Sequence, residues 1–257
     1  MIKDVVVITP LWKESSAMIQ ALSDSIAEVG KNLNSRGVEI RHFFLDDCRP
    51  WHLPNGVPKL VRHKKNQGLS KTLIDGYEEV LFLKPKPDLV VKIDCQEHDP
   101  KMIIPIIDHF NHSISKAVFL PICYWVRGQP RPLMTTVVND IADFRASLSP
   151  INEKGILLAY NQKFPLGFQA FRREVLEQIM PKLEKGYDLF EDRFGQPSWG
   201  FDLLAILLSA NLFPQQIDFL FGGWMSPWEE NRNPEKTAVQ REKAEKIIKI
   251  AFDLGCL

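Results

Sequence analysis

The residues best placed to do chemistry lie in the segment DLVVKIDCQEHDP, residues 88–100. A strand-like apolar run, Leu89–Ile93, ends abruptly at Asp94, and the polar residues Gln96 and Asp99 follow. The carboxyl ends of buried strands are where an open α/β sheet usually presents its functional groups. Oxygen ligands at such a position suit a hard cation, Mg²⁺ or Mn²⁺, which protein sites commonly share with substrate phosphates. The segment therefore predicts a site for a metal ion and a diphosphate, with Asp94 as its main ligand.

Polar residues also follow three other predicted strands. They are Glu14 after the strand at 5–9, Asp46 and Asp47 after the strand at 40–45, and Asn66–Lys71 after the strand at 59–62. In a parallel sheet the carboxyl ends of neighbouring strands lie along one edge, so these residues would line one crevice together with Asp94. One acidic strand end is common, but four polar strand ends in succession indicate a binding site.

The elements that must position these residues alternate in type over the first 120 residues. Apolar residues at helical spacing between positions 18 and 33, and a second helix at about 70–83, separate runs that predict strands at 5–9, 40–45, 59–62, 89–93 and 117–122. The second half predicts helices at 132–148, 173–183, 201–211 and 234–254, and short strands at 167–171 and 217–221. This order predicts a single α/β domain with a mainly parallel central sheet flanked by helices.

The composition narrows the class of protein. The 257 residues include 32 basic and 32 acidic side chains, and this balance argues against a dedicated nucleic-acid binder. The four cysteines, at positions 48, 95, 123 and 256, are scattered and no signal peptide precedes the first strand, so we expect reduced thiols in a cytoplasmic protein. No apolar run approaches the roughly 18 residues of a membrane span, so we expect any membrane association to be peripheral, at the inner face.

The order and spacing of several motifs give the sequence a specific resemblance. The chain resembles the family-2 glycosyltransferases, which have the nucleotide-sugar-binding GT-A fold, over roughly residues 4–225. The matching segments are PLWKE (10–14) for P-x-x-N-E, FLDD (44–47) for V-D-D, NQGLSKTL (66–73) for N-x-G-x-x-x-A-L, and IDCQEHDP (93–100) for D-x-D-x-x-x-P. GFQAFRREVL (167–176) is close to the G-F-R-A-F-R-R-E-V-L of the dolichyl-phosphate mannose synthase branch.

The resemblance implies a single GT-A (Rossmann-like) domain over residues 1–257. It would have a nucleotide-binding half at 1–122, an acceptor half at 123–230 and a C-terminal helix at 231–257. By the family pattern, Glu14 and Asp47 would contact the nucleoside, and Asp94 and Gln96 would bind the Mg²⁺ or Mn²⁺ ion. The whole predicted nucleotide-sugar site comprises Pro10, Glu14, Asp46, Asp47, Asn66, Gly68 and Lys71.

Structural roles compete with two of these assignments. Glu14 can offset the dipole at the start of a helix. Asp94 can cap a turn at the end of its strand. The sequence favours Asp94 as the stronger functional candidate and leaves the two interpretations of Glu14 equal.

The acceptor side also has two interpretations. In the branch that the chain resembles, the nucleophile is the ionised phosphate of a polyprenyl phosphate, which needs no general base. Arginines would then suffice to position it, with Arg131 in a catalytic role and Arg127 and Arg172 binding the acceptor. A hydroxyl acceptor would need a base, and the candidate is Asp202, which follows two aromatic residues at the start of an apolar helix.

Two departures from the family pattern leave more than one function open. Gln96 replaces the second acid of D-x-D and carries no charge, and KFPL (163–166) replaces the acidic lead-in of the mannose synthase branch. The leading hypothesis is a metal-dependent, inverting glycosyltransferase of the hexosyltransferase type that takes its sugar from a nucleotide diphosphate. The alternatives are a nucleotide-sugar-binding protein with impaired catalysis and a nucleotidyltransferase. The sequence leaves the oligomeric state open.

Overall fold

The computed structural model describes the chain except residues 12–13, 49–56, 96–98, 121–122, 126–167, 198–199, 215, 220–224, 228–233 and 257. Its strands are β1 (Asp4–Leu11), β2 (Glu39–Asp46), β3 (Lys59–Arg62), β4 (Leu89–Lys92), β5 (Ala117–Leu120), β6 (Cys123–Trp125), β7 (Phe168–Arg172), β8 (Ile217–Phe219) and β9 (Met225–Pro227). Its helices are α1 (Ser16–Asn34), α2 (Leu69–Phe82), the short 3₁₀ helix η1 (Pro100–Met102), α3 (Ile103–His112), α6 (Arg173–Phe194), α7 (Phe201–Leu212) and α8 (Pro234–Asp253).

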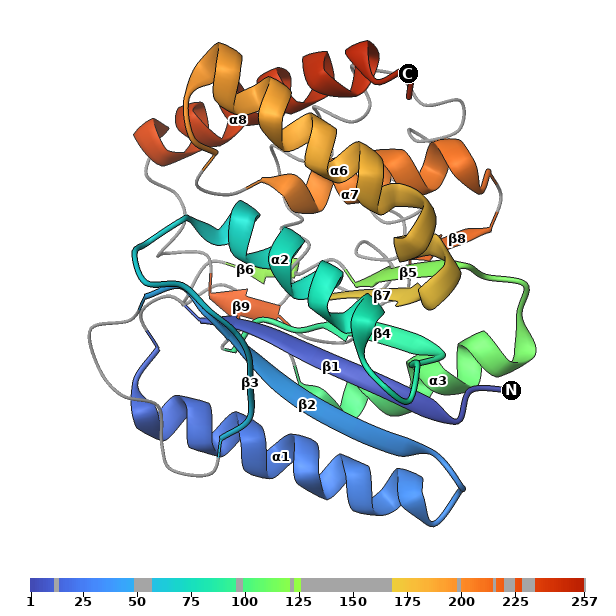
Figure 1. Cartoon of the computed structure of the whole chain (residues 1–257). Helices are drawn as coiled ribbons and strands as arrows, with labels where there is room; N and C mark the ends of the chain where they lie inside the picture. Colours follow the sequence, from blue (N-terminus) through green and yellow to red (C-terminus); the bar gives the residue numbers. More distant parts are fainter. Residues whose placement is uncertain are drawn as a thin grey trace.

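Seven strands form a central sheet in the order β3-β2-β1-β4-β7-β5-β8 (Figure 1). All neighbours are parallel except β7, which runs antiparallel to both β4 and β5. A separate pair of parallel strands is formed by β6 and β9. The predicted single α/β domain with a mainly parallel sheet is confirmed, and the antiparallel direction of β7 is an addition that the sequence did not predict.

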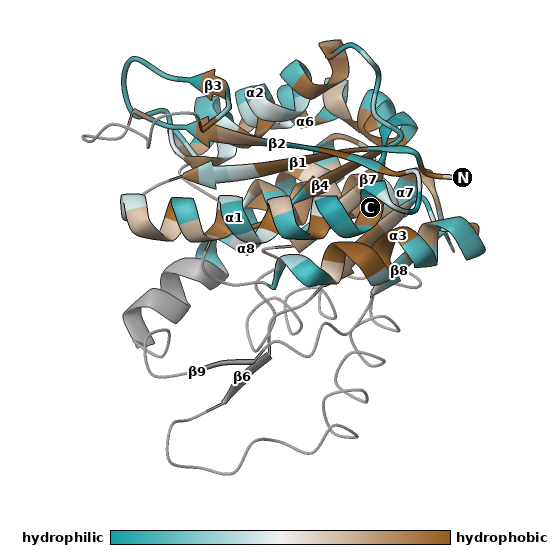
Figure 2. Cartoon of the chain, turned by 90° about the horizontal axis from the view of Figure 1, so that it is seen from below, coloured by the Kyte–Doolittle hydropathy of each residue, from teal (hydrophilic) through white to brown (hydrophobic). Residues whose placement is uncertain are grey.

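Helices cover both faces of the sheet (Figures 1 and 2). Val6 and Ile8 of β1 belong to the hydrophobic core that contains α2, α6, α7 and α8, whereas Val5 and Val7 belong to the core that contains α1 and α3. Because helices bury both faces, the inner strands carry nearly continuous apolar runs. The polar residues that end these strands are therefore the natural markers of the sheet's carboxyl edge.

One close approach fixes α2 over the sheet. A Cβ added at Gly76, in the middle of α2, would overlap the side chain of Leu45 on β2. The helix also begins directly after Gly68, whose φ of 83° lies in the region that glycine adopts without strain. These two glycines set the height of α2 above β2 and the path of the loop that enters it.

The second half differs from expectation mainly in the lengths of its elements. The helix expected at 173–183 continues as α6 to Phe194 and contains Pro181 within it. The helix expected at 132–148 lies outside the described residues. Within the part of the chain that is described, no helix is both long enough and apolar enough to cross a membrane.

Candidate functional site

A buried lysine joins two carboxylates at the carboxyl edge of the sheet. Lys92, the last residue of β4, has a side chain that is 1% exposed. Its Nζ lies 2.7 Å from Oδ1 of Asp94 and 3.6 Å from Oδ1 of Asp202. The two carboxylates are more exposed than the lysine, at 26% and 17%. The structure therefore brings together two acids that the sequence predicted separately, one from each half of the chain.

Asp202 is held in place by the start of α7. It lies in the first turn of that helix, where a carboxylate interacts favourably with the helix dipole. The helix follows Gly200, whose φ is 107° and whose added Cβ would come within 2.7 Å of Cδ1 of Ile247. Position 200 therefore needs glycine for its backbone angle, and α7 begins directly after it with Phe201 and Asp202 in its first turn.

The surroundings of Asp202 favour a proton acceptor. Its Oδ1 is buried and accepts no hydrogen bond from the described residues. Burial raises the pKa of Asp202, the nearby Lys92 ammonium opposes this effect, and the Asp94 carboxylate adds to it. A partly exposed carboxylate with a raised pKa suits general-base chemistry.

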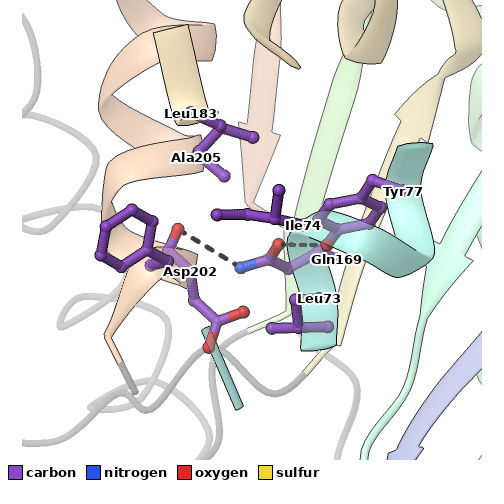
Figure 3. A pocket seen from close by; sticks show the side chains of 8 residues that line it. Leu73, Ile74, Tyr77, Gln169, Leu183, Asp202 and Ala205 are labelled. Atoms are coloured by element: carbon purple, nitrogen blue, oxygen red, sulfur yellow. Dashed lines mark hydrogen bonds between the residues drawn. The ribbon is translucent and has the colours of Figure 1, made fainter. Parts of the chain in front are cut away.

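A buried polar pair, Gln169 and Tyr77, is hydrogen-bonded to the first turn of α7 (Figure 3). Gln169 of β7 lies opposite Lys92 in the strand register and is fully buried. Its Oε1 accepts a hydrogen bond of 3.2 Å from the Tyr77 hydroxyl, and its Nε2 donates one of 3.4 Å to the backbone oxygen of Asp202. Burial raises the pKa of Tyr77 well above its usual value, so the hydroxyl keeps its proton and stays a donor. Gln169 thus links α2, β7 and the first turn of α7.

The cavity beside these residues is too small for a substrate. It offers about 10 Å³ of space and is lined by apolar side chains of α2, α6 and α7 together with Tyr77, Gln169 and Asp202 (Figure 3). A space of this size holds about one water molecule. The cavity is therefore a small gap in the packing beside Asp202.

The predicted nucleoside contact Asp47 has a different environment. It follows β2 and uses both of its oxygens within the protein. Its Oδ1 accepts a hydrogen bond of 2.7 Å from the N–H of Gln67, and its Oδ2 accepts one of 2.7 Å from the N–H of Gly68. The Nδ1 atom of His63 lies 2.8 Å from Oδ1, and Nε2 of the same ring lies 2.9 Å from Asp75. Asp47 therefore holds the loop that leads into α2.

The other predicted nucleotide-site residues lie along the same edge. Asn66 accepts a hydrogen bond of 2.9 Å from the N–H of Gly68, and Lys71 pairs with Asp75 at 2.6 Å on the first turns of α2. Asp46 is buried at the end of β2 with Arg62 at 3.7 Å. Pro10 is buried near the end of β1, and Glu14 is partly exposed just after that strand. The parallel strands β1, β2 and β4 thus present their ends together, as predicted.

The structure does not bring Arg172 to this edge. Because β7 is antiparallel, its last residue lies opposite Leu89, at the start of β4. There the Arg172 guanidinium donates hydrogen bonds to the backbone oxygens of Phe110, at 2.6 Å, and Ser115, at 2.9 Å. The side chain closes the end of α3 at the amino edge of the sheet. Arg127, Arg131 and Gln96 lie outside the described residues.

Of the two predicted metal ligands, Asp94 lies among the described residues and Gln96 does not. Oδ1 of Asp94 is paired with the buried ammonium of Lys92 at 2.7 Å. Among the described residues, no group of three or more histidine, cysteine, aspartate or glutamate side chains is arranged to hold a metal ion. We therefore derive no chemical step through a metal, and Mg²⁺ or Mn²⁺ binding stays a prediction of the sequence.

Sequence reasoning missed three residues of this arrangement, namely Lys92, Gln169 and Tyr77. Lys92 had a visible signal, because it is the one charged residue inside the run LVVKI. Lysine is almost never fully buried unless it is paired. A lysine in a strand whose neighbours are all apolar therefore predicts a buried partner carboxylate.

Comparisons with known proteins support the fold of the chain and do not identify its family. No family model and no curated protein sequence matches the chain. S. aureus TarS 1-349 is similar in structure, with 12% identity and a TM-score of 0.52 over 97% of this chain and 72% of that one. Two further structures match with TM-scores below 0.5. A 4-diphosphocytidyl-2C-methyl-D-erythritol synthase from Anaerococcus prevotii DSM 20548 has 12% identity and a TM-score of 0.44, covering 86% of this chain and 89% of that one. A glycosyltransferase involved in glycosylation of the major capsid of PBCV-1 has 7% identity and a TM-score of 0.40, covering 94% and 98%. The likeness to TarS confirms the predicted α/β fold.

Proposed function

We propose that this protein is a glycosyltransferase that moves a sugar from a nucleotide diphosphate to an acceptor. The observation that carries the proposal is the meeting of Asp94 and Asp202 on one buried ammonium at the carboxyl edge of the sheet. Open α/β sheets bind their ligands at this edge. The two acids come from positions far apart in the sequence, so an incidental ion pair between neighbours does not explain them.

The proposed reaction is a single displacement at the anomeric carbon. The acceptor oxygen forms a bond to that carbon, and the bond from the carbon to the diphosphate oxygen breaks with its electron pair on the departing nucleotide. This step inverts the configuration of the sugar. A hydroxyl acceptor would give its proton to Asp202, whose raised pKa suits this role.

The acceptor defines a finer proposal. A polyprenyl phosphate would need no base, and Arg127 and Arg131 would position its phosphate by paired hydrogen bonds. With such an acceptor Asp202 would act by charge alone, and the protein would work at the inner face of a membrane. The proposed hexosyl substrate and the cytoplasmic location rest on the sequence, which leaves the oligomeric state open.

A thermal-shift panel tests the nucleotide site. We expect one of UDP, GDP, CDP, TDP and ADP to raise the unfolding midpoint selectively, because a ligand that binds the native state stabilises it. Hydrolysis of the matching nucleotide sugar, with water as acceptor, then measures chemistry. The Asp94→Asn variant should lose at least about 10³-fold in this rate and keep its fold.

The matched control is Asp99→Asn, five residues along the same segment. Asp99 accepts a hydrogen bond from the N–H of Lys101 and begins η1, a role that asparagine also fills. Loss of hydrolysis in both variants, or in neither, would contradict the assignment of Asp94.

A second candidate function has its own support. Gln96 puts a neutral amide where the family pattern has an acid, which favours a protein that binds the nucleotide sugar without transferring it. Selective stabilisation by one diphosphate with no hydrolysis of any matching sugar donor, and no transfer to a polyprenyl phosphate, would favour this candidate.

A further inference from the structure

We propose that Lys92 is a positioning residue of the proposed reaction, whose buried ammonium holds the carboxylate of Asp202 in place as the proton acceptor. This inference rests on the proposed function, because it assigns a further residue to the same chemistry. The side chain of Lys92 is 1% exposed, so it is buried beneath the surface that a substrate would contact. It acts on the reaction through Asp202.

The two carboxylate partners of Lys92 lie at unequal distances from its ammonium. Nζ lies 2.7 Å from Oδ1 of Asp94, which is the length of a charge-assisted hydrogen bond. Oδ1 of Asp202 lies 3.6 Å away, which is close enough for an ion pair but too long for a hydrogen bond. Asp94 follows β4 directly, whereas Asp202 belongs to α7. Asp94 therefore anchors the ammonium at its own strand end, and the ammonium attracts Asp202 to the same place.

The backbone of Asp202 is attached separately from its side chain. Gln169, which lies opposite Lys92 in the pairing of β4 with β7, donates a hydrogen bond of 3.4 Å to the backbone oxygen of Asp202. The Tyr77 hydroxyl in turn donates to Gln169. These bonds hold the first turn of α7 whether or not an ammonium is present. The loss of the Lys92 ammonium should therefore act on the Asp202 carboxylate rather than on the turn that carries it.

The ammonium also favours the charge state that a base needs. Burial raises the pKa of Asp202, the Lys92 ammonium opposes this effect, and the Asp94 carboxylate adds to it. A buried carboxylate beside another carboxylate tends to take up a proton when no cation is near. The three groups together carry one negative charge, and they would still carry one if the ammonium were lost and Asp202 became protonated. Removal of the ammonium should therefore disable the base without changing the charge that these groups present to the donor.

Steady-state hydrolysis of the nucleotide sugar that matches the diphosphate selected by the panel tests this role. In Lys92→Met, kcat should fall at least about tenfold, because an uncharged and misplaced Asp202 accepts the proton of water poorly. KM should change by less than about threefold, because the ammonium does not contact the donor. A merely structural role would not separate the two constants in this way.

A double variant tests whether Lys92 acts through Asp202. Added to Asp202→Asn, the Lys92→Met change should lower the rate by less than about twofold, since the group that Lys92 positions is already gone. The double variant also removes both opposing charges at once, which a protein interior tolerates better than the removal of one partner.

The matched control for the substitution is Lys116→Met. Lys116 pairs with Glu174 in a partly exposed position, just before β5. This variant loses the same charge and gains the same side chain at a surface pair. It should keep both kcat and KM.

Each outcome has a separate meaning. If the unmodified protein hydrolyses no nucleotide sugar, the proposed transferase function is overturned, and the role of Lys92 falls with it. If the protein is active but Lys92→Met keeps its kcat, or changes only KM, the function stands and the role of Lys92 is overturned. A further loss in the double variant overturns it as well. If circular dichroism shows that Lys92→Met does not fold, the double variant and Asp202→Asn decide, since their rates must agree.

Discussion

Two acidic strand ends on the same edge of the sheet differ in what surrounds them. Asp47, after β2, accepts hydrogen bonds from the backbone N–H groups of Gln67 and Gly68 and contacts His63. Asp94, after β4, shares the Lys92 ammonium with Asp202, whose Oδ1 accepts no hydrogen bond from the described residues. The loop between β3 and α2 satisfies Asp47, whereas Asp94 and Asp202 share one buried ammonium.

The difference shows how to separate a structural acid from a functional one. A carboxylate that fills its acceptor sites with backbone N–H groups must break those bonds to hold a ligand, and each broken bond leaves a donor unsatisfied. Two carboxylates that share one buried cation keep lone pairs for a substrate. By this criterion we expect the chemistry at the end of β4 and a structural role for Asp47 at the end of β2.

The largest effect that would break this comparison is expected at Asp202. The Asp202→Asn variant should lose about 10²-fold or more in donor hydrolysis, because the amide cannot accept the proton of the attacking water. Burial raises the pKa of Asp202, and a base must be ionised, so hydrolysis by the unmodified protein should rise with pH through this pKa. Initial rates across pH measure both effects, and the variant should lack the rise. Full activity in Asp202→Asn would show that Asp202 is not the base, and the contrast between Asp47 and the Asp94–Asp202 pair would then lose its functional meaning.

A change at Asp47 should instead appear in stability. Asp47→Ala should lower the free energy of unfolding by about 2–4 kcal/mol, because the N–H of Gln67 and the His63 ring lose a buried acceptor. Urea denaturation measures this loss. Asp24→Ala is the control, because Asp24 accepts only an exposed bond from Gln20 on α1, and we expect about 0.5 kcal/mol or less. Weakened nucleotide binding at unchanged stability would return Asp47 to the role of nucleoside contact.

The smallest effect is expected at Arg172, which lies at the amino edge of the sheet and so tests whether binding is confined to the carboxyl edge. Arg172→Met should cost about 1–2 kcal/mol of unfolding free energy, because it removes the hydrogen bonds to Phe110 and Ser115. Nucleotide affinity by titration should not change, since the side chain lies at the opposite edge from Asp94. A clear loss of affinity for donor or polyprenyl phosphate would show that the amino edge also takes part in binding.

Most of the first half of the fold could be predicted because its signals are local. The run Val5–Thr9 is apolar and β-branched, and it became the core of β1. Ser15 caps α1 and accepts a hydrogen bond from the N–H of Met18, which is a local signal. The predicted end of α6 at residue 183 was wrong because the apolar face of the helix continues past Leu183. Tyr187 and Phe190 pack against Phe201 and so extend the helix.

Residues of the candidate site could be predicted only where the signal lay in neighbouring positions of the sequence. Asp94 and Asp202 could be named from their neighbours in sequence, but their shared partner could not, because Lys92 and Asp202 lie 110 positions apart (202 minus 92). The place of Arg172 depends on the direction of β7, which pairing with two distant strands decides. A parallel β7 would have put Arg172 beside Asp94, and the antiparallel strand puts it at the far edge.

The central position of β7 has a consequence for the newly made chain. β4 ends at residue 92, and β7, its second neighbour, begins at residue 168, which is 76 positions later (168 minus 92). At ordinary rates of synthesis, about 5–20 residues per second, the ribosome needs several seconds to make that interval. During this time a folded β3-β2-β1-β4 unit would present an open strand edge, which other chains can pair with. The strand that unites the two halves of the site is thus also the one whose late arrival exposes the nascent protein to aggregation.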